Sequence, residues 1–332
     1  MRKVLNKTML IIILSICIIT LNGSSLEKEM QILAEAYGYI MGQNMMLEKI
    51  KDNYPDLKVN VIQAEFKFKS SFRKSEENIE IKLKELMGEY YNEFMNNYKI
   101  EIRKMFVDIE YNREESLSFL EEVKQRAEGN IESPIKEVLL TYQYIDRPEN
   151  EIIDGYVKKY RSKGHKKAKG VEIVIKVPYS WKGMQGDRPN IVQKFKHKNG
   201  EGLTGFILLI KNIPQEELAF IRKNGSEEYY NQVDNESVKQ MNSKLIHREI
   251  VKIDRYQWSK IVTETKEKGI GFPVNIISLI YTTIVQDELV QMTFSVANFT
   301  DEENLWDEYD KYKMLFDMIA YSIVLPEQYI DN

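Results

Sequence analysis

Cysteine is nearly absent from this sequence, because Cys17 is the only one among 332 residues. A fold held together by disulfides and a cysteine-rich zinc site are therefore both excluded. Histidine is also scarce: His165, His197 and His247 lie in separate parts of the chain without the spacing of a metal-binding motif. There is no GxSxG nucleophile motif either. We therefore expect no metal, no cofactor and no nucleophilic catalytic residue.

Long apolar runs are missing too, with one exception at the N-terminus. Met9–Leu21 is apolar except for Ser15 and Thr20, and it follows three basic residues. A run of 13 residues is too short for an ordinary membrane-spanning helix, and it is typical of a signal peptide. The sequence thus predicts a signal peptide over residues 1–23, cleavage after Gly23 and export to the periplasm or beyond. It also excludes a multi-pass membrane protein.

Two alternatives to simple cleavage remain open for this segment. The apolar run can be retained as a membrane anchor. Leu14-Ser15-Ile16-Cys17 resembles a lipoprotein signal, but Ile16 is large for the position before a lipidated cysteine. Lipidation of Cys17 is therefore the less favoured interpretation.

The chain does not carry an excess of positive charge. It contains 47 basic and 51 acidic residues, and removal of Arg2, Lys3 and Lys7 with the signal peptide would leave 44 and 51. An acidic balance of this kind gives no electrostatic reason to expect a nucleic-acid partner. The 20 Tyr and 13 Phe residues exclude a disordered chain.

The first half of the chain has the periodicity of helices. Apolar residues recur every three or four positions from Glu76 to about Tyr111, and the same spacing occurs over Leu26–Lys51. Further helices are indicated around 117–123 and after Pro134, and a last one from Pro148 to Tyr160. We expect a helical domain over residues 24–157, a bundle of five or six helices.

A basic segment follows the helices. Residues 158–170 contain seven Lys and Arg, no acid and two glycines. We interpret the segment as a solvated linker between domains. The alternative is a local patch that contacts an anionic lipid or polymer, since each basic group near an anionic surface contributes about 1 kcal/mol.

The periodicity changes from helical to alternating after Gly170. Strands are predicted over 173–177, 190–198, 203–212, 244–253, 256–265, 274–285 and 288–297, with helices over 214–223 and 227–241 and a closing helix from about Leu305 to Ile323. This order predicts an α+β fold class: an N-terminal helical bundle, then an antiparallel sheet domain over 171–329.

The C-terminal half resembles the PsbP-like fold family. The resemblance rests on the opening strand into Val177-Pro178-Tyr179-Ser180-Trp181, the hairpin at 191–195, the paired strands at 256–265 and 274–285, and the closing strand and helix. It covers roughly 155 residues. Because the family mostly contains accessory and binding modules, the resemblance implies a non-enzymatic role.

Two glycine patterns have plain structural interpretations. Gly200-Glu201-Gly202-Leu203-Thr204-Gly205 spells a dinucleotide-binding motif, but a strand rather than a helix is expected after it, so we predict a hairpin turn. Gly38 and Gly42 are four residues apart and allow two helices to approach closely. That approach can occur within the domain or in a homo-oligomer.

Trp181, Arg188 and Asn190 are the candidate binding residues. Trp181 follows Pro178 at the end of a predicted strand, and aromatic and arginine side chains at loop edges are frequent binding anchors. The alternative is that Trp181 closes one end of the sheet. Trp258 lies in the middle of a strand and is expected in the core.

The sequence thus favours an exported, non-enzymatic protein of the bacterial envelope. We expect the sheet domain to bind a protein or another envelope component and the helical domain to present it or to oligomerise. Membrane contact is expected only through the signal segment or the basic segment. Two alternatives are an envelope hydrolase that uses Asp and Glu residues in an interdomain cleft, and a secreted effector.

Overall fold

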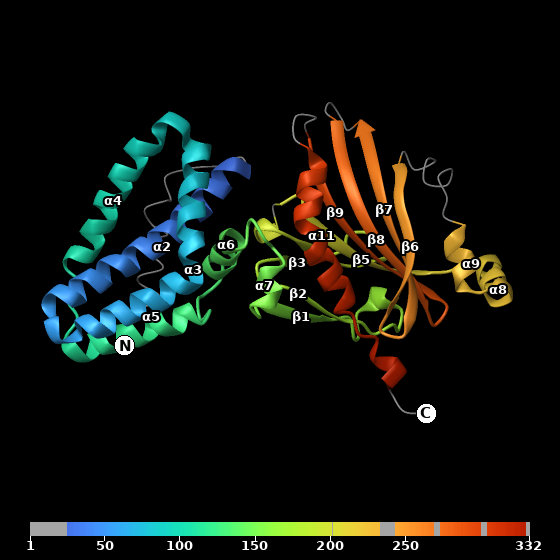
Figure 1. Ribbon diagram of the computed structural model, residues 1–332, viewed down its shortest axis with the longest axis horizontal. Helices are drawn as coiled ribbons and strands as arrows, with labels where there is room; N and C mark the ends of the chain where they lie inside the picture. The colour runs from blue at the N-terminus through green and yellow to red at the C-terminus, as the bar shows by residue number, and fades with distance from the viewer. Residues whose placement is uncertain (1–24, 201, 233–242, 269–272, 300–303, 330–332) are drawn as a thin grey trace. The chain divides into compact units, whose positions relative to one another are not determined.

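The computed structural model describes residues 25–200, 202–232, 243–268, 273–299 and 304–329 (Figure 1). The predicted signal peptide and Cys17 lie outside these residues. The chain divides into two compact units, 1–145 and 146–332. None of the helices in the described ranges is long and apolar enough to span a membrane.

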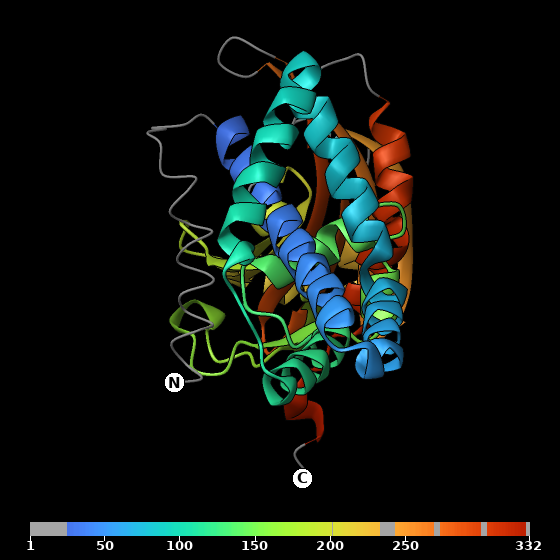
Figure 2. The same ribbon diagram turned by 90° about the vertical axis from the view of Figure 1, so that its left-hand side faces the viewer.

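The described residues of the first unit, 25–145, form helices and no strands. Its helices are α2 (Ser25–Asn53), α3 (Lys58–Met87), α4 (Tyr91–Val107), α5 (Arg113–Ala127) and α6 (Ile135–Gln143), with 3₁₀ turns at Pro55–Leu57 and Gly88–Tyr90. Figure 2 shows α2 lying between α3 and α4, and α3 also packs on α5 and α6. The predicted helical bundle is confirmed.

The long helix predicted over 76–111 is interrupted. Gly88 has a φ of 55°, a conformation that favours glycine and ends α3. The buried positions keep a spacing of four residues across the break, from Ile79 and Leu83 before it to Tyr91 and Met95 after it. The apolar repeat alone did not reveal the break, because it continues on both sides with nearly the same spacing.

The two glycines of α2 serve packing within this unit. A Cβ atom at Gly38 would lie 2.2 Å from the hydroxyl of Tyr98, and one at Gly42 would lie 2.7 Å from the Phe106 ring. Both aromatic residues belong to α4. The Tyr98 hydroxyl donates a hydrogen bond of 2.7 Å to the carbonyl of Ala34. The structure thus shows packing within the domain at these glycines, and the homo-oligomer stays a prediction.

The second unit is an antiparallel sheet with helices. After α7 (Asn150–Ile153) come β1 (Val157–Arg161), β2 (Val174–Pro178), β3 (Lys182–Gln185), β4 (Ile191–Lys196) and β5 (Gly205–Asn212). Then follow α8 (Gln215–Asn224), α9 (Ser226–Asn231), β6 (Ser243–Ile253), β7 (Tyr256–Lys268), β8 (Pro273–Val285), β9 (Glu288–Asn298) and α11 (Leu305–Tyr321). Short 3₁₀ turns occur at Lys166–Ala168, Lys198–Gly200 and Pro326–Tyr329. The predicted α+β fold class is confirmed.

The main sheet has seven strands in the order β3-β4-β5-β9-β8-β7-β6, and β1 and β2 form a separate two-stranded sheet. Alternate residues of the central strands, such as Met292 and Phe294, are buried against α11, which lies across one face (Figure 1). At one end of the other face, Leu289 is covered by Leu218 of α8 and by Ile213, which precedes that helix. The described residues of the GxGxxG pattern lie in the connection between the antiparallel strands β4 and β5 and at the start of β5, as predicted.

The basic segment is not a linker, and the interpretation of residues 158–170 is corrected here. Val157–Arg161 pairs with β2 in full antiparallel register, and Tyr160 packs on the Phe195 ring. Gly155, with a φ of 88°, follows α7, so the helix predicted from Pro148 to Tyr160 ends at Ile153. The i, i+4 spacing of Tyr156 and Tyr160 fits a helix face, but the same residues also alternate as a strand requires.

Candidate functional site

Helix α11 has one buried face and one exposed face. One face is buried in the sheet core through residues such as Tyr312, Phe316 and Ile319. The other carries Met314 and Tyr321, whose side chains are 54% and 50% exposed. Large exposed apolar side chains at helical spacing, next to charged ones, are a common feature of binding surfaces.

A shallow groove of about 470 Å³ follows this exposed face of α11. The residues that line it are Asp310, Lys313, Met314, Asp317, Met318 and Tyr321. Asp317 links the groove to the sheet, because its carboxylate accepts hydrogen bonds from the hydroxyl of Tyr281 on β8 and from Lys260 on β7. The Tyr321 and Tyr281 rings meet edge to face at 6.4 Å.

Lys260 is the centre of this charge network. Its ammonium nitrogen lies 3.1 Å from a carboxylate oxygen of Glu249 on β6 and 3.3 Å from one of Asp317 on α11. The nitrogen also lies 5.6 Å from the centre of the Tyr281 ring. Only 9% of the residue is exposed. The network therefore joins β6, β7, β8 and α11 through one buried cation.

The electrostatics keep these groups in their ordinary protonation states. Burial alone would lower the pKa of Lys260, but the charges and hydrogen bonds of Asp317 and Glu249 outweigh it and raise that pKa. Burial, the hydrogen bond to Asp317 and its charge raise the pKa of Tyr281. Lys260 therefore remains an ammonium ion and Tyr281 a neutral phenol, so neither supplies a nucleophile or a base near neutral pH.

Strand β6 forms one edge of the main sheet beside this network. Among the described strands it pairs only with β7, so its other backbone edge has no strand partner there. The register shifts between Leu245 and His247, and the four residues from Ile246 to Glu249 are all exposed. An edge strand of eleven residues can accept an additional strand from another polypeptide.

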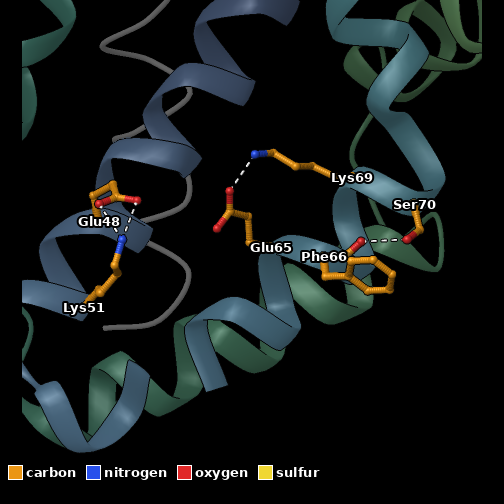
Figure 3. Close-up of polar contacts among 6 residues, drawn as sticks. All are labelled: Glu48, Lys51, Glu65, Phe66, Lys69 and Ser70. Carbon is orange, nitrogen blue, oxygen red and sulfur yellow. Dashed lines mark hydrogen bonds and ion pairs between the residues drawn. The ribbon is translucent and has the colours of Figure 1, made fainter. Parts of the chain in front are cut away.

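The helical unit has a groove of its own on α3, of about 600 Å³. The Ser70 hydroxyl bonds back to the Phe66 carbonyl at 2.8 Å, and Phe72 departs from helical geometry. Such back-bonding bends helices. Figure 3 shows this contact and the ion pair of Lys69 with Glu65 on the next turn. All the residues that line the groove belong to α3, so the groove does not bring together groups from different elements.

Comparison with known proteins gives distant structural similarities. The solution structure of cyanobacterial PsbP (CyanoP) from Synechocystis sp. PCC 6803 is 17% identical, covers 51% of this chain and 92% of its own, and has a TM-score of 0.34. A crystal structure from Bacteroides thetaiotaomicron VPI-5482 is 10% identical, with a TM-score of 0.26. It covers 46% of this chain and 44% of its own. The PsbP-like family indicated by the sequence is thus among the similar structures.

Neither the family models nor the curated proteins extend this result. No family model matches the chain. No curated protein is similar to it.

Trp181 is not available as a binding contact, and this candidate is corrected. It is 1% exposed and packs against Phe206, Phe316 and His197, with ring centres 6.3 to 6.5 Å away. Burial lowers the pKa of His197 to about 3, so the imidazole is neutral. Trp181 thus closes the end of an uncharged aromatic core, which is the alternative interpretation from the sequence. Trp258 is fully buried, as expected.

Arg188 and Asn190 lie in the turn between β3 and β4. The Arg188 side chain is exposed, and its carbonyl accepts a hydrogen bond from Lys167. Asn190 is half-buried, and its carbonyl accepts a bond of 2.9 Å from the amide of Ile210. Neither residue lines the groove of α11. Their binding role stays a prediction.

Sequence reasoning did not select Lys260, although a signal for it exists. It occupies an inward position between Trp258 and Val262 in a correctly predicted strand, where a charge needs a partner. Its partner Asp317 is 57 residues away, and only the fold shows that they meet. The three histidines lie in three separate segments of the sheet unit, and the described residues contain no group of three or more His, Cys, Asp or Glu that could hold a metal ion.

Proposed function

We propose that this protein is an exported, non-enzymatic binding module of the bacterial envelope, and that its sheet unit captures an extended segment of a partner protein. The observation that carries the proposal is the long edge strand β6 beside the groove of α11. A partner strand added to β6 would form backbone hydrogen bonds along the free edge. Its side chains on the α11 side would face the groove.

The chemistry of the groove supports recognition rather than catalysis. Lys260 is already engaged by two carboxylates, and Asp317 by two donors. Met314 and Tyr321 provide apolar contact at the rim. Flexible methionine and rigid tyrosine side chains suit the binding of varied apolar residues.

The hydrolase alternative needs acidic groups that converge. Among the described carboxyl groups, burial raises the pKa of Glu76 and of Glu151. Glu76 belongs to the helical unit, whereas Glu151 belongs to the sheet unit, where its oxygens accept hydrogen bonds from Ser180. These two carboxyl groups belong to different units, and neither lies in the groove of α11, so we do not propose a hydrolase.

Photo-crosslinking in the native envelope tests the proposed function. A photoreactive amino acid at Ile246 on β6, and separately at Met314 on α11, should capture the same partner. Lys223 on the exposed side of α8 is the matched control position and should not capture it. The amides of Ile246–Glu249 should then become protected from hydrogen exchange when the identified partner segment is added. Capture from Lys223 alone, or no protection of β6, would contradict the proposal.

A further inference from the structure

The edge strand β6 carries more basic than acidic side chains (Figure 1). Its eleven residues include three basic ones, Lys244, Arg248 and Lys252. The one acidic residue of the strand, Glu249, has a carboxylate oxygen 3.1 Å from the ammonium nitrogen of Lys260, so this charge is already engaged inside the sheet unit. Lys252 is exposed and forms no ion pair within the described residues. The edge is therefore positively charged, although acidic residues outnumber basic ones in the chain.

The turn that ends β6 determines which of its residues present backbone groups to the free edge. β6 and β7 are joined by a two-residue turn whose φ values are both positive, 46° and 70°. Such values are typical of a type I′ hairpin, in which the flanking pair, here Ile253 and Tyr256, exchanges both backbone hydrogen bonds. Hydrogen-bonded and non-hydrogen-bonded pairs alternate along an antiparallel ladder. The N–H and C=O groups that point away from β7 therefore belong to Arg248, Ile250 and Lys252.

The side chains of these three edge residues lie on the face of the sheet away from α11. Lys260 of β7 reaches Asp317 on α11, and the residue directly opposite it on β6 is Glu249. Side chains alternate between the two faces of a strand, so the edge residues on either side of Glu249 belong to the other face. Arg248 accordingly donates a hydrogen bond of 2.9 Å to the carbonyl of Asn231 in α9. Two positive charges thus flank one apolar side chain along the edge.

These charges restrict which strand can pair with β6. A second copy of β6, paired antiparallel about Ile250, would place Arg248 of each copy opposite Lys252 of the other. Like charges at directly opposite positions destabilise a sheet, whereas opposite charges stabilise it. The edge therefore disfavours pairing between two copies of this chain, and it favours a strand with acidic residues at both positions.

We propose that the partner segment captured by β6 is acidic, with carboxylate side chains opposite Arg248 and Lys252 and an apolar side chain opposite Ile250. Alternate residues of an extended chain share one face, so the segment has the pattern acidic-x-apolar-x-acidic. The two residues between these positions face the α11 side, where Val251 of β6 packs against the core. The inference rests on the proposed function of β6 and adds the chemistry of the segment that it captures.

Three synthetic peptides test this chemistry. TTEVITETT is acidic, TTQVITQTT is neutral and TTKVITKTT is basic, and they differ only at the two positions expected opposite the charges of β6. Each peptide carries a fluorescent label, and its binding to the chain from Ser24 onward is measured by anisotropy. We expect the acidic peptide to bind about tenfold more tightly than the neutral one, because two opposite-charge pairs form, and the basic peptide to bind most weakly. High salt should reduce these differences.

Reversal of the charges on β6 separates recognition from folding. Arg248→Glu/Lys252→Glu should bind the basic peptide about tenfold more tightly than the acidic one, which damage to the fold cannot produce. Should this double variant fail to fold, Lys252→Glu alone, at an exposed position, should remove most of the preference for the acidic peptide. The control Lys58→Glu/Lys74→Glu reverses the same charge at exposed positions of α3 and should keep the original preference.

The outcomes distinguish this inference from the proposed function. Equal binding of the three peptides, tightest binding of the neutral or basic one, or a preference that does not follow the charge of β6 would overturn the acidic partner and leave strand capture by β6 intact. If no peptide binds and photo-crosslinking from Ile246 captures no protein, β6 does not capture a strand, and the proposed function fails together with the inference.

Discussion

At the residue scale, Glu151 shows two opposing influences on one carboxyl group. It is 3% exposed, and its two oxygens accept hydrogen bonds from the amide and hydroxyl of Ser180 at 2.7 and 2.6 Å. Burial raises its pKa to about 7, and the hydrogen bonds from Ser180 oppose that rise. The contact fixes α7 to the turn between β2 and Trp181, so its protonation affects the stability of the sheet unit.

The first prediction follows from the sign of this shift. Between pH 4.5 and 7 the folded protein holds a proton on Glu151 that the unfolded chain has lost, so the free energy of unfolding falls as the pH rises through this window. The full contribution is present below pH 4.5, and at most about 3 kcal/mol is lost by pH 8. Denaturant unfolding of Glu151→Gln between pH 5 and 8 should lack this part of the pH dependence. Glu216→Gln, an exposed control on α8, should retain it. An identical slope in both variants would contradict the assignment.

Single residues were the least predictable part of the site. Trp181 was selected because of its place at a strand end, but whether such a residue faces solvent or the core depends on what covers it. Phe206 and Phe316, which cover it here, come from distant segments. Lys260 was predictable as an inward charge, and Glu249 lies opposite it across β6 and β7, whereas its partner Asp317 required the crossing of α11 over the sheet. Long-range pairing of this kind leaves no mark in a local pattern.

At the scale of elements, small residues decide how closely helices pack. Tyr98 reaches across α2 to Ala34 only because Gly38 has no side chain. Phe106 occupies the equivalent space over Gly42. These two contacts set the approach of α4 to α2, so they belong to the architecture of the helical unit.

The second prediction concerns this approach. Gly38→Ala should lower the stability of the helical unit by about 2 kcal/mol, because the steric overlap with Tyr98 outweighs the better helix propensity of alanine. Tyr98→Phe removes the overlapping oxygen and should restore part of the loss. The same Tyr98→Phe change should not rescue Gly42→Ala, whose clash is with Phe106. Thermal unfolding of these single and double variants checks this pattern, and a Gly38→Ala protein more stable than the original would contradict it.

Elements of the second unit were predicted well where the alternation is long. The four strands from β6 to β9 and helix α11 lie within a few residues of their predicted bounds. The short strand β3 was missed, and β1 was assigned to a helix. Strands of four or five residues contain too few alternations to decide the period, and β1 is defined mainly by its pairing with β2.

At the scale of the whole molecule, the boundary between the units falls earlier than the sequence indicated. Composition placed it in the basic segment, because charge and glycine are typical of linkers. The chain instead divides at Ile145 and Asp146. Lysine side chains can occupy the exposed side of a strand when a residue on its other side is packed against the fold, as Tyr160 is here. The change in composition therefore marks a change in surface charge and not the boundary between the units.

The final prediction tests the corrected boundary with two fragments of the sheet unit. The fragment 146–332 keeps α7 and β1, whereas the fragment 171–332, which begins near the boundary expected from the sequence, removes both. The shorter fragment, 171–332, therefore loses the pairing of β1 with β2, the contact of Tyr160 with Phe195 and the hydrogen bonds between Glu151 and Ser180.

We expect the fragment 146–332 to unfold cooperatively in urea. The fragment 171–332 should be less stable by several kcal/mol or aggregate, because β2 and the buried polar groups of Ser180 lose their partners. Near-ultraviolet circular dichroism of the Trp181 region reports the loss directly. Equal urea midpoints for the two fragments would mean that β1 adds nothing to the fold, and the boundary in the basic segment would then be correct.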